Sequence, residues 1–215
     1  MLVSIVGGHG QIARLLTPLL RSSGHGVRGL VRSADQFDDL HRIGADPVPC
    51  DLEGAGPRDV DAALSGSDVV VFAAGAGPGS GAERKLTLDR DGAIAAVESA
   101  VRVGARRFVM ISAMGTDDPP TGDEVFSVYL RAKAAADDAV RAADLASVVV
   151  RPGRLTDGRP TGLVTLARHV ERGEITRADV AAVLAQLITT GTGDGHTIEV
   201  VGGDTPIAEA VAGLG

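Results

Sequence analysis

A tyrosine and a lysine stand four residues apart in this chain. Tyr129 is its only tyrosine, and Lys133 is one of two lysines among 215 residues. Side chains at positions i and i+4 of a helix lie on the same face, one turn apart. An ammonium group beside a phenol favours the phenolate and lowers the tyrosine pKa toward neutrality, which makes the hydroxyl a usable acid or base. The pair therefore predicts proton transfer, with a surface pair on a helix as the alternative.

A glycine-rich turn follows the first apolar run of the chain, and it reads Gly7-Gly8-His9-Gly10-Gln11-Ile12-Ala13. A phosphate needs exposed backbone N–H groups and close approach, which Gly7 and Gly10 permit because they lack a Cβ atom. The turn leads into an amphipathic helical pattern, and a helix N-terminus adds partial positive charge. A strand, a glycine turn and a helix in this order predict that residues 7–12 bind a dinucleotide. A glycine cluster alone would indicate only a turn.

The end of the second apolar run indicates which nucleotide is bound. An NAD enzyme places Asp or Glu there to hold the ribose 2′-hydroxyl, whereas this chain has Arg32 and Ser33. A guanidinium and a hydroxyl suit the 2′-phosphate of NADP, and no acid competes for the same place. We expect NADP, with NAD less favoured; the alternative is that Arg32 is a solvated strand end. Asp51 and Leu52 follow the third run and are placed to meet the adenine, unless Asp51 only begins a helix.

Short apolar runs alternate with helical patterns over most of the chain. Apolar runs without polar alternation are typical of strands buried on both faces, as in a parallel sheet covered by helices above and below. Long helices are expected at about residues 83–103 and 125–143, and the second carries Tyr129 and Lys133. The sequence predicts an α/β fold with a doubly wound parallel sheet, whose strands are residues 3–6, 27–31, 47–50, 69–73, 108–111 and 147–150.

The regular pattern fades after Pro152 and Gly153. Thr176, with Asp179 three residues later, resembles a capping box and predicts a helix start. We interpret residues 1–215 as one domain, in which residues 152–215 form a small C-terminal segment that acts as a substrate lid. The elements expected in this segment are a strand near residues 163–166, a helix over about 177–189, a strand near 197–201 and a last helix from about residue 207.

Composition limits the class of partner. A net charge of −7 without a basic run gives no electrostatic footprint for nucleic acid or an anionic membrane. The longest apolar run is too short to cross a bilayer. Cys50 is the sole cysteine and the histidines lack a ligand spacing, so we expect a reducing compartment and no metal site. The sequence predicts a cytoplasmic monomer or homodimer whose partner is a small molecule.

Ser112 ends the fifth expected strand, so its hydroxyl lies at the carboxyl edge of the sheet, where open α/β sheets bind ligands. A serine there, Tyr129-x-x-x-Lys133 on the next helix and an N-terminal glycine turn together resemble the short-chain dehydrogenase/reductase superfamily. The chain looks most like its atypical and extended branch, the Rossmann-fold NAD(P)-binding proteins called epimerase/dehydratase-like or NmrA-like. The further motifs that carry this resemblance are Gly7-x-x-Gly10-x-x-Ala13, Asp51-Leu52, Ala73-Ala74-Gly75 and Val150-Arg151-Pro152-Gly153.

The resemblance implies a role for each of these residues. Tyr129 would be the acid or base, Lys133 would lower its pKa and hold the nicotinamide ribose, and Ser112 would hydrogen-bond the substrate oxygen. The chain contains no asparagine, so the Asn of the proton relay in many members is missing and any relay must run through water and main chain. The residues that would line the cofactor beyond the glycine turn are Ala73, Ala74, Gly75, Pro152 and Gly153.

The function that this resemblance implies is an NADPH-dependent reduction of a small carbonyl, quinone or similar acceptor. One alternative is a non-catalytic NADP(H)-binding sensor or regulator, although a sensor needs the phosphate site and no acid. A weaker alternative is a sugar-nucleotide epimerase or dehydratase, because those relatives carry a larger C-terminal substrate domain. The substrate cavity would be formed by residues 113–123, by the segment after Gly153 and by the loop of residues 75–81.

Overall fold

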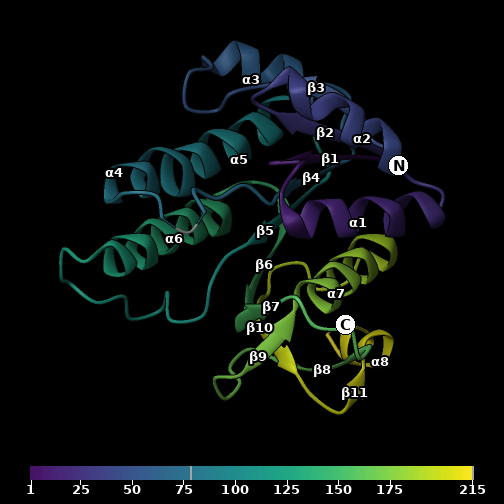
Figure 1. Ribbon diagram of the computed structural model, residues 1–215, viewed down its shortest axis with the longest axis vertical. Helices are drawn as coiled ribbons and strands as arrows, with labels where there is room; N and C mark the ends of the chain where they lie inside the picture. The colour runs from purple at the N-terminus through teal and green to yellow at the C-terminus, as the bar shows by residue number, and fades with distance from the viewer. Residues whose placement is uncertain (78, 215) are drawn as a thin grey trace.

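The computed structural model describes residues 1–77 and 79–214 (Figure 1). Its strands are β1 (Leu2–Val6), β2 (Gly26–Val31), β3 (Asp46–Pro49), β4 (Val69–Phe72), β5 (Arg107–Ile111), β6 (Ala146–Pro152), β7 (Arg154–Thr156), β8 (Leu163–Ala167), β9 (Glu174–Thr176), β10 (Thr197–Gly202) and β11 (Thr205–Pro206). Its α-helices are α1 (Gln11–Ser22), α2 (Phe37–Ile43), α3 (Pro57–Leu64), α4 (Ala82–Arg84), α5 (Ala93–Arg102), α6 (Val125–Ala142), α7 (Arg177–Thr190) and α8 (Ile207–Ala212). A 3₁₀ turn, η1 (Ala34–Gln36), precedes α2, and a π-helical stretch, η2 (Lys85–Gly92), joins α4 to α5.

Within the described residues, the main sheet has nine strands in the order β11-β8-β10-β6-β5-β4-β1-β2-β3. The pairs from β3 to β10 are parallel, whereas β8 is antiparallel to both β10 and β11. Val6 is paired with Phe72, and Phe72 with Met110, so these strands end side by side. The strand order reverses between β1 and β4, which is the place where doubly wound sheets bind ligands. The predicted doubly wound parallel sheet is confirmed.

Helices cover both faces of the sheet (Figure 1). Successive strand residues point to opposite faces. Val3 and Ile5 of β1 therefore pack in one core with α1, α2 and α7, while Val6 packs in a second core with α3, α5 and α6. The purple α1 and the yellow-green α7 lie against each other on the first face, although they are distant in sequence. This packing fixes α1 with its N-terminus at the carboxyl edge of β1.

Residues after Pro152 both extend the sheet and cover it. β10 pairs with β6 in parallel, and β8 and β11 follow outward, while α7 packs against α1 on one face. β7 and β9 form a small separate pair beside the sheet edge. The expected start of α7 is confirmed, because the Asp179 N–H donates to Thr176 Oγ1 over 2.9 Å.

No helix in the described parts of the chain combines the length and the apolar character needed to cross a bilayer.

Candidate functional site

The glycine turn lies in a narrow space between two strands. Gly7 has a φ of +79°, and a Cβ atom on it would lie 2.6 Å from Ala74 Cα, beyond the end of β4. A Cβ atom on Gly8 would lie 2.6 Å from Gly29 Cα in β2. Contacts this close involve backbone that cannot move aside. Gly7 and Gly8 are therefore required for packing of the turn, and Gly7 also lines the neighbouring cavity, so its expected role in phosphate approach stays a prediction.

Gly10 and the start of α1 offer free backbone donors. Gly10 is the N-cap of α1 with an extended backbone, and no side chain caps the helix. The first main-chain N–H of the helix with a backbone acceptor is that of Arg14, which donates to Gly10 O over 2.9 Å. A Cβ atom on Gly10 would lie 3.1 Å from Gly7 O and 3.6 Å from Ala73 O, with no other atom outside its chain neighbours within 4 Å. The N–H groups of Gln11 and Ile12 are therefore placed to receive a pyrophosphate, and the turn fits that group.

His9 is held beside this turn by an acid of α2. Its Nε2 lies 2.9 Å from Asp39 Oδ2, and Arg42 Nη1 lies 2.6 Å from the other carboxylate oxygen. The hydrogen bond from His9, followed by that from Arg42, lowers the pKa of Asp39. His9 thus has a fixed place in the cavity wall rather than a free position on the surface.

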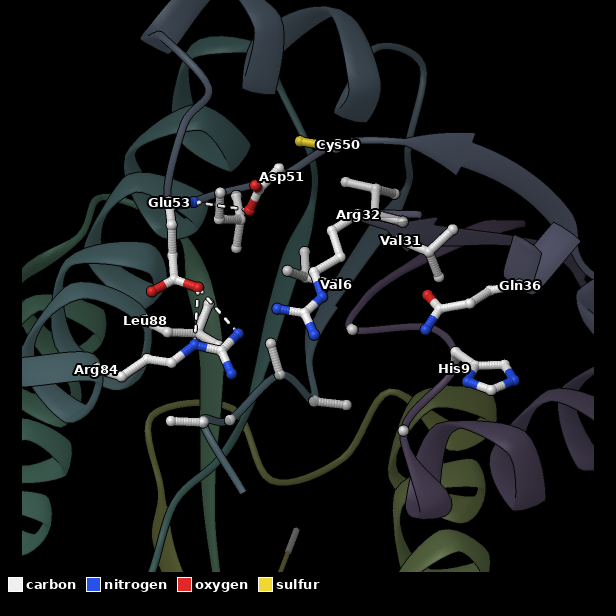
Figure 2. Close-up of a pocket in the computed structure, with 18 residues that line it drawn as sticks. Val6, His9, Val31, Arg32, Gln36, Cys50, Asp51, Glu53, Arg84 and Leu88 are labelled. Carbon is white, nitrogen blue, oxygen red and sulfur yellow. Dashed lines mark hydrogen bonds and ion pairs between the residues drawn. The ribbon is translucent and has the colours of Figure 1, made fainter. Parts of the chain in front are cut away.

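A cavity of about 340 Å³ lies at the adenine end of the site, between the ends of β1, β2 and β3. Figure 2 shows Arg32 extending into it, with Glu53 and Arg84 on one side and Gln36 on the other. The predicted residues that line this cavity are Gly7, His9, Gly10, Arg32, Asp51, Leu52, Ala73, Ala74 and Gly75. The predicted Ser33 is not in the lining, because its hydroxyl donates to Asp35 at the start of η1.

Sequence reasoning missed a carboxylate and a guanidinium in this cavity. Glu53 Oε2 accepts a hydrogen bond from Arg84 Nε over 3.0 Å, and Oε1 accepts one from Thr87 over 2.7 Å. Burial opposes ionisation of Glu53, but the contacts with Arg84 and Thr87 and the charge of Arg32 lower its pKa. The expectation that no acid competes near Arg32 was therefore wrong. A residue separation of 31 between Glu53 and Arg84 leaves no local pattern from which this pair could be found.

A second cavity, of about 840 Å³, continues from the glycine turn past the end of β5. It brings together residues that are far apart in sequence, namely Gly10, Gln11, Ile12, Ala73, Ala74, Gly75, Ser112, Tyr129, Lys133 and Pro152. A third cavity, of about 450 Å³, shares Ser112 and Tyr129 with it and adds the predicted Gly153. The expected loop of residues 75–81 contributes Gly75, Gly77, Gly79 and Ser80, while Pro78 lies outside the described residues.

Ser112 presents an unused hydroxyl to both cavities. It follows β5, where its N–H donates to Val150 O over 2.7 Å and fixes the backbone. The residue is 4% exposed, and its Oγ makes no hydrogen bond of standard geometry in the described parts of the chain, although it lies near the Asp137 carboxylate and lowers its pKa. A buried hydroxyl without a partner carries a desolvation cost. Ser112 lines two cavities at the carboxyl edge of the sheet, where the sequence placed it, and its contact with a ligand oxygen stays a prediction.

Lys133 lies on α6 one turn from Tyr129, but its ammonium faces other groups. Nζ donates to Ile111 O over 2.9 Å, lies 3.8 Å from Asp89 Oδ1 and is 5.5 Å from the centre of the Phe72 ring. Burial lowers the pKa of Lys133, and the charge of Asp89 opposes this shift. The lysine lines the second cavity and is held there by the end of β5 and by the π-helical stretch.

The pKa of Tyr129 is raised, which corrects the predicted lowering. Burial of the phenol is the largest cause, and the charges of Asp89 and Asp137 add to it. Both carboxylates disfavour the phenolate, whereas the Lys133 ammonium is engaged with Asp89 and Ile111 O. Spacing alone placed the tyrosine and lysine on one face, but it did not reveal the acids that surround them. Tyr129 is therefore a protonated donor at neutral pH.

Asp89 and Lys85 are further site residues that sequence reasoning missed, and both belong to the π-helical stretch η2. Asp89 is buried, and its Oδ2 accepts a hydrogen bond from the Ala76 N–H over 3.2 Å. Lys85 Nζ donates to Gly77 O over 2.8 Å and lies 5.3 Å from the centre of the Tyr129 ring. The only available signal was that Lys85 is the other lysine of a chain that has just two.

A buried ion pair supports α6 from behind the cavity. Arg151 Nε donates to Asp137 Oδ2 over 3.0 Å, and its Nη1 donates to Asp117 Oδ1 over 2.7 Å. Burial raises the pKa of Asp137, while the Ser112 hydroxyl and the charge of Arg151 act against this shift. The pair joins β6 to the helix that carries Tyr129, and so fixes their separation.

A group of possible metal ligands lies next to this ion pair. Side-chain ligand atoms of Asp117, His169 and Glu199 lie within 4.8 Å of one another, a grouping that sequence spacing did not suggest. The guanidinium of Arg151 already donates to Asp117, however, and the Val170 N–H donates to Glu199 Oε2 over 2.9 Å. Positive charge at this distance opposes cation binding, so we assign this group no metal role.

Comparisons with known proteins agree with this geometry. A family model described as NAD(P)H-binding matches residues 7–191. The chain is 36% identical over 215 residues to the uncharacterized sugar epimerase YhfK of Bacillus subtilis (strain 168), with 100% of both chains covered. It is 32% identical over 187 residues to a ceramide reductase of Caulobacter vibrioides (strain NA1000 / CB15N), covering 86% of this chain and 54% of that one.

A solved structure from Bacillus halodurans, provisionally named an NAD-dependent epimerase/dehydratase, superposes with a TM-score of 0.93. It shares 40% sequence identity, and 100% of both chains is covered. The family match and this structural similarity both include the glycine turn and the elements that carry Ser112, Tyr129 and Lys133. We conclude that this protein belongs to the NAD(P)H-binding family of Rossmann-fold proteins.

Proposed function

We propose that this protein is an NADPH-dependent reductase of the short-chain dehydrogenase/reductase type, and that it reduces a small carbonyl, quinone or similar acceptor. The observation that carries the proposal is the position of Ser112. Its buried hydroxyl lies in the cavity shared with Tyr129 and the glycine turn, close to the Asp137 carboxylate but without a hydrogen bond of standard geometry in the described chain. A sensor of nucleotide state would need the phosphate site but no free hydroxyl and phenol beside it.

The choice of NADPH over NADH is supported by Arg32. Its guanidinium extends into the adenine cavity (Figure 2), and no ion pair of Arg32 is found in the parts of the chain that the structure describes. A free guanidinium suits a phosphate through parallel charge-assisted hydrogen bonds. The carboxylates of Asp51 and Glu53 in the same cavity are the features that would favour NADH, and Glu53 is already engaged by Arg84.

The residues around the second cavity account for the proton that reduction requires. When bound, the reduced nicotinamide supplies a hydride, which carries two electrons to the carbonyl carbon and opens the C=O π bond. Ser112 donates a hydrogen bond to the carbonyl oxygen, which stabilises the negative charge that develops there. Tyr129 gives its phenolic proton to that oxygen, and the tyrosine regains a proton from solvent. The raised pKa of Tyr129 suits this direction, because the phenol stays protonated until a more basic alkoxide forms.

Lys133 acts in this scheme as a positioning residue and a ribose ligand. Its ammonium is anchored by Ile111 O and Asp89, so it presents its remaining donor capacity toward the cavity. Asp89 also accepts the Ala76 N–H and thereby ties the loop after β4 to η2. A buried carboxylate next to the lysine lies near the place where a relay group is needed, in a chain that has no asparagine.

A sugar-nucleotide epimerase or dehydratase is less well supported. After Pro152, β10, β8 and β11 extend the central sheet and α7 packs against α1, so this segment is built onto the Rossmann core rather than forming a separate substrate domain.

The test is the oxidation of NADPH in the presence of a panel of carbonyls, quinones and flavins. Tyr129→Phe keeps the ring and the helix but removes the acid, so turnover should fall by a factor of about 10² to 10⁴ while NADPH affinity changes little. Lys133→Met should reduce both turnover and affinity. Turnover that is indifferent to Tyr129→Phe would point to direct hydride transfer with protonation by solvent. No turnover of any acceptor, with NADPH still bound in the micromolar range, would favour the sensor.

A further inference from the structure

We propose that the acceptor is a ring-bearing, apolar molecule that carries a carboxylate, and that Arg172 binds this carboxylate at the end of the cavity away from the nucleotide. The inference rests on the proposed reductase function for the reacting end of the cavity. It adds the chemical class of the substrate and a residue that selects it.

The charges around the third cavity are of one sign. Its charged lining residues are Arg154 and Arg172, and no carboxylate belongs to its wall. Arg154 is already paired with Glu174 across β7 and β9. Arg172 has no ion pair in the described parts of the chain, although the protein has a net charge of −7. An unpaired guanidinium at the wall of a cavity whose lining contains no carboxylate favours an anionic ligand.

Arg172 lines the cavity from the segment that precedes β9. A Cβ atom placed on Gly115, in the loop after β5, would lie 3.4 Å from Arg172 Nη2. The guanidinium therefore lies beside the loop that continues from Ser112, and both residues line the same cavity. Arg172 is exposed, so its guanidinium can meet a ligand without first losing a protein partner. A planar fork of N–H donors matches the two oxygens of a carboxylate.

The rest of the wall is apolar and includes an uncovered aromatic ring. Met114, Phe126 and Leu155 line the cavity together with Arg172. Phe126 is 63% exposed, the highest value among the large apolar side chains of the described residues. Its ring centre lies 6.1 Å from that of Tyr129, which places an apolar surface next to the proton donor. Exposed apolar surface at the mouth of a cavity is typical of a ligand site, and a flat ring would cover it.

These features set the orientation of the ligand. The carbonyl group lies at Ser112 and Tyr129, the ring lies against Phe126 and Leu155, and the carboxylate extends to Arg172. A neutral ligand of the same shape leaves Arg172 in water and gains only the apolar contacts. Comparing a carboxylate with its methyl ester therefore separates the contribution of the Arg172 contact from that of the apolar contacts.

The experiment uses two aldehydes of different length, 4-formylbenzoate and 6-formyl-2-naphthoate, each with its methyl ester. Dissociation constants are measured by calorimetry on protein saturated with NADP⁺, where no reduction occurs, and KM and kcat are measured with NADPH. At least one acid should bind on the order of tenfold more tightly than its ester. Arg172→Leu should remove this difference and raise KM for the acid, with kcat and nucleotide affinity unchanged. Arg168→Leu, an exposed arginine outside the cavity, should keep the difference.

The outcomes separate this inference from the reductase proposal. Equal binding of acid and ester, binding of neither, or a preference that survives Arg172→Leu would overturn the carboxylate site. A preference that depends on Arg172 but comes without turnover would support the site and count against reduction of these aldehydes. Phe126→Ala should weaken acid and ester to the same extent, because the ring contact does not depend on charge. Arg172→Lys should retain part of the preference.

Discussion

The ammonium of Lys133 lies 3.8 Å from the carboxylate of Asp89, and both groups are buried between α6 and η2. The carboxylate opposes the lowering of the Lys133 pKa by burial, and it adds to the raising of the Tyr129 pKa. A negative charge favours an ammonium and disfavours a phenolate. Asp89 thus helps to keep the Lys133 ammonium and the Tyr129 phenol protonated.

Asp89→Asn should therefore move the pH dependence of reduction. Removal of the charge lets the pKa of Tyr129 fall, and the proton donor is lost as pH rises through that pKa. The limb of the kcat profile that declines at high pH should shift to lower pH. Asp91→Asn, which alters a more exposed acid of the same stretch, should leave the profile in place. An identical profile for Asp89→Asn and the unaltered protein would mean that Tyr129 is not the titrating donor.

Arg32→Ala should weaken NADPH binding about tenfold to a hundredfold and leave NADH binding nearly unchanged. The reason is that only NADPH carries the phosphate with which the guanidinium pairs. Nucleotide fluorescence titrations measure both affinities. Arg58→Ala serves as the control, because it removes an exposed arginine that does not line the cavity. Equal affinities of the unaltered protein for the two nucleotides would contradict the assignment to NADPH.

Gly10→Val should abolish nucleotide binding without unfolding the protein. The φ of Gly10 is −63°, which any residue adopts, and the branched side chain would fill the space above the N-terminus of α1. Gly8→Ala should behave differently, because its Cβ atom would meet the Gly29 backbone at 2.6 Å. We expect it to lower the free energy of unfolding by about 1–3 kcal/mol. Thermal melting reports whether Gly8 or Gly10 is needed for packing, and nucleotide titration reports whether either is needed for phosphate binding.

Asp117→Asn should reduce the loss of stability in acid. The hydrogen bond from Arg151 holds the pKa of Asp117 below its ordinary value, despite partial burial. A carboxyl group with a lowered pKa stabilises the fold above its unfolded pKa, and this contribution is lost as pH falls through the folded pKa. Urea unfolding between about pH 5 and pH 3 should thus show a shallower decline for the variant. A decline as steep as that of the unaltered protein would show that the contact with Arg151 adds no stability.

The sequence was sufficient where a feature depends on local periodicity. Unbroken apolar runs predicted the parallel strands, and the glycine-rich turn was expected between a strand and a helix, where it is observed between β1 and α1. α6 was expected at residues 125–143 and is observed at Val125–Ala142. Ser112 could be placed because a residue that follows a buried parallel strand lies at the carboxyl edge of the sheet.

Features that depend on contacts between distant segments could not be predicted. Asp89 approaches Lys133 because η2 is π-helical, and the spacing of apolar residues in the sequence did not predict this wider turn. The Tyr129 pKa depends on burial and on two acids, one from the preceding helix, so the spacing to Lys133 gave the wrong direction. Arg84 and Glu53 meet only because the loop after β3 folds back over η2 and α4.

Lys85 and Lys133 are the only lysines of the chain, and both belong to the wall of one cavity, with 8% and 4% of their surfaces exposed. The outside of the protein therefore offers amine-directed reagents little beyond the amino terminus. Acylation of a side-chain amine would report access to this cavity, and a bound nucleotide should slow it. Coupling to a sensor surface through amines would likewise attach the protein mainly by its N-terminus and leave the cavity mouth open to ligands.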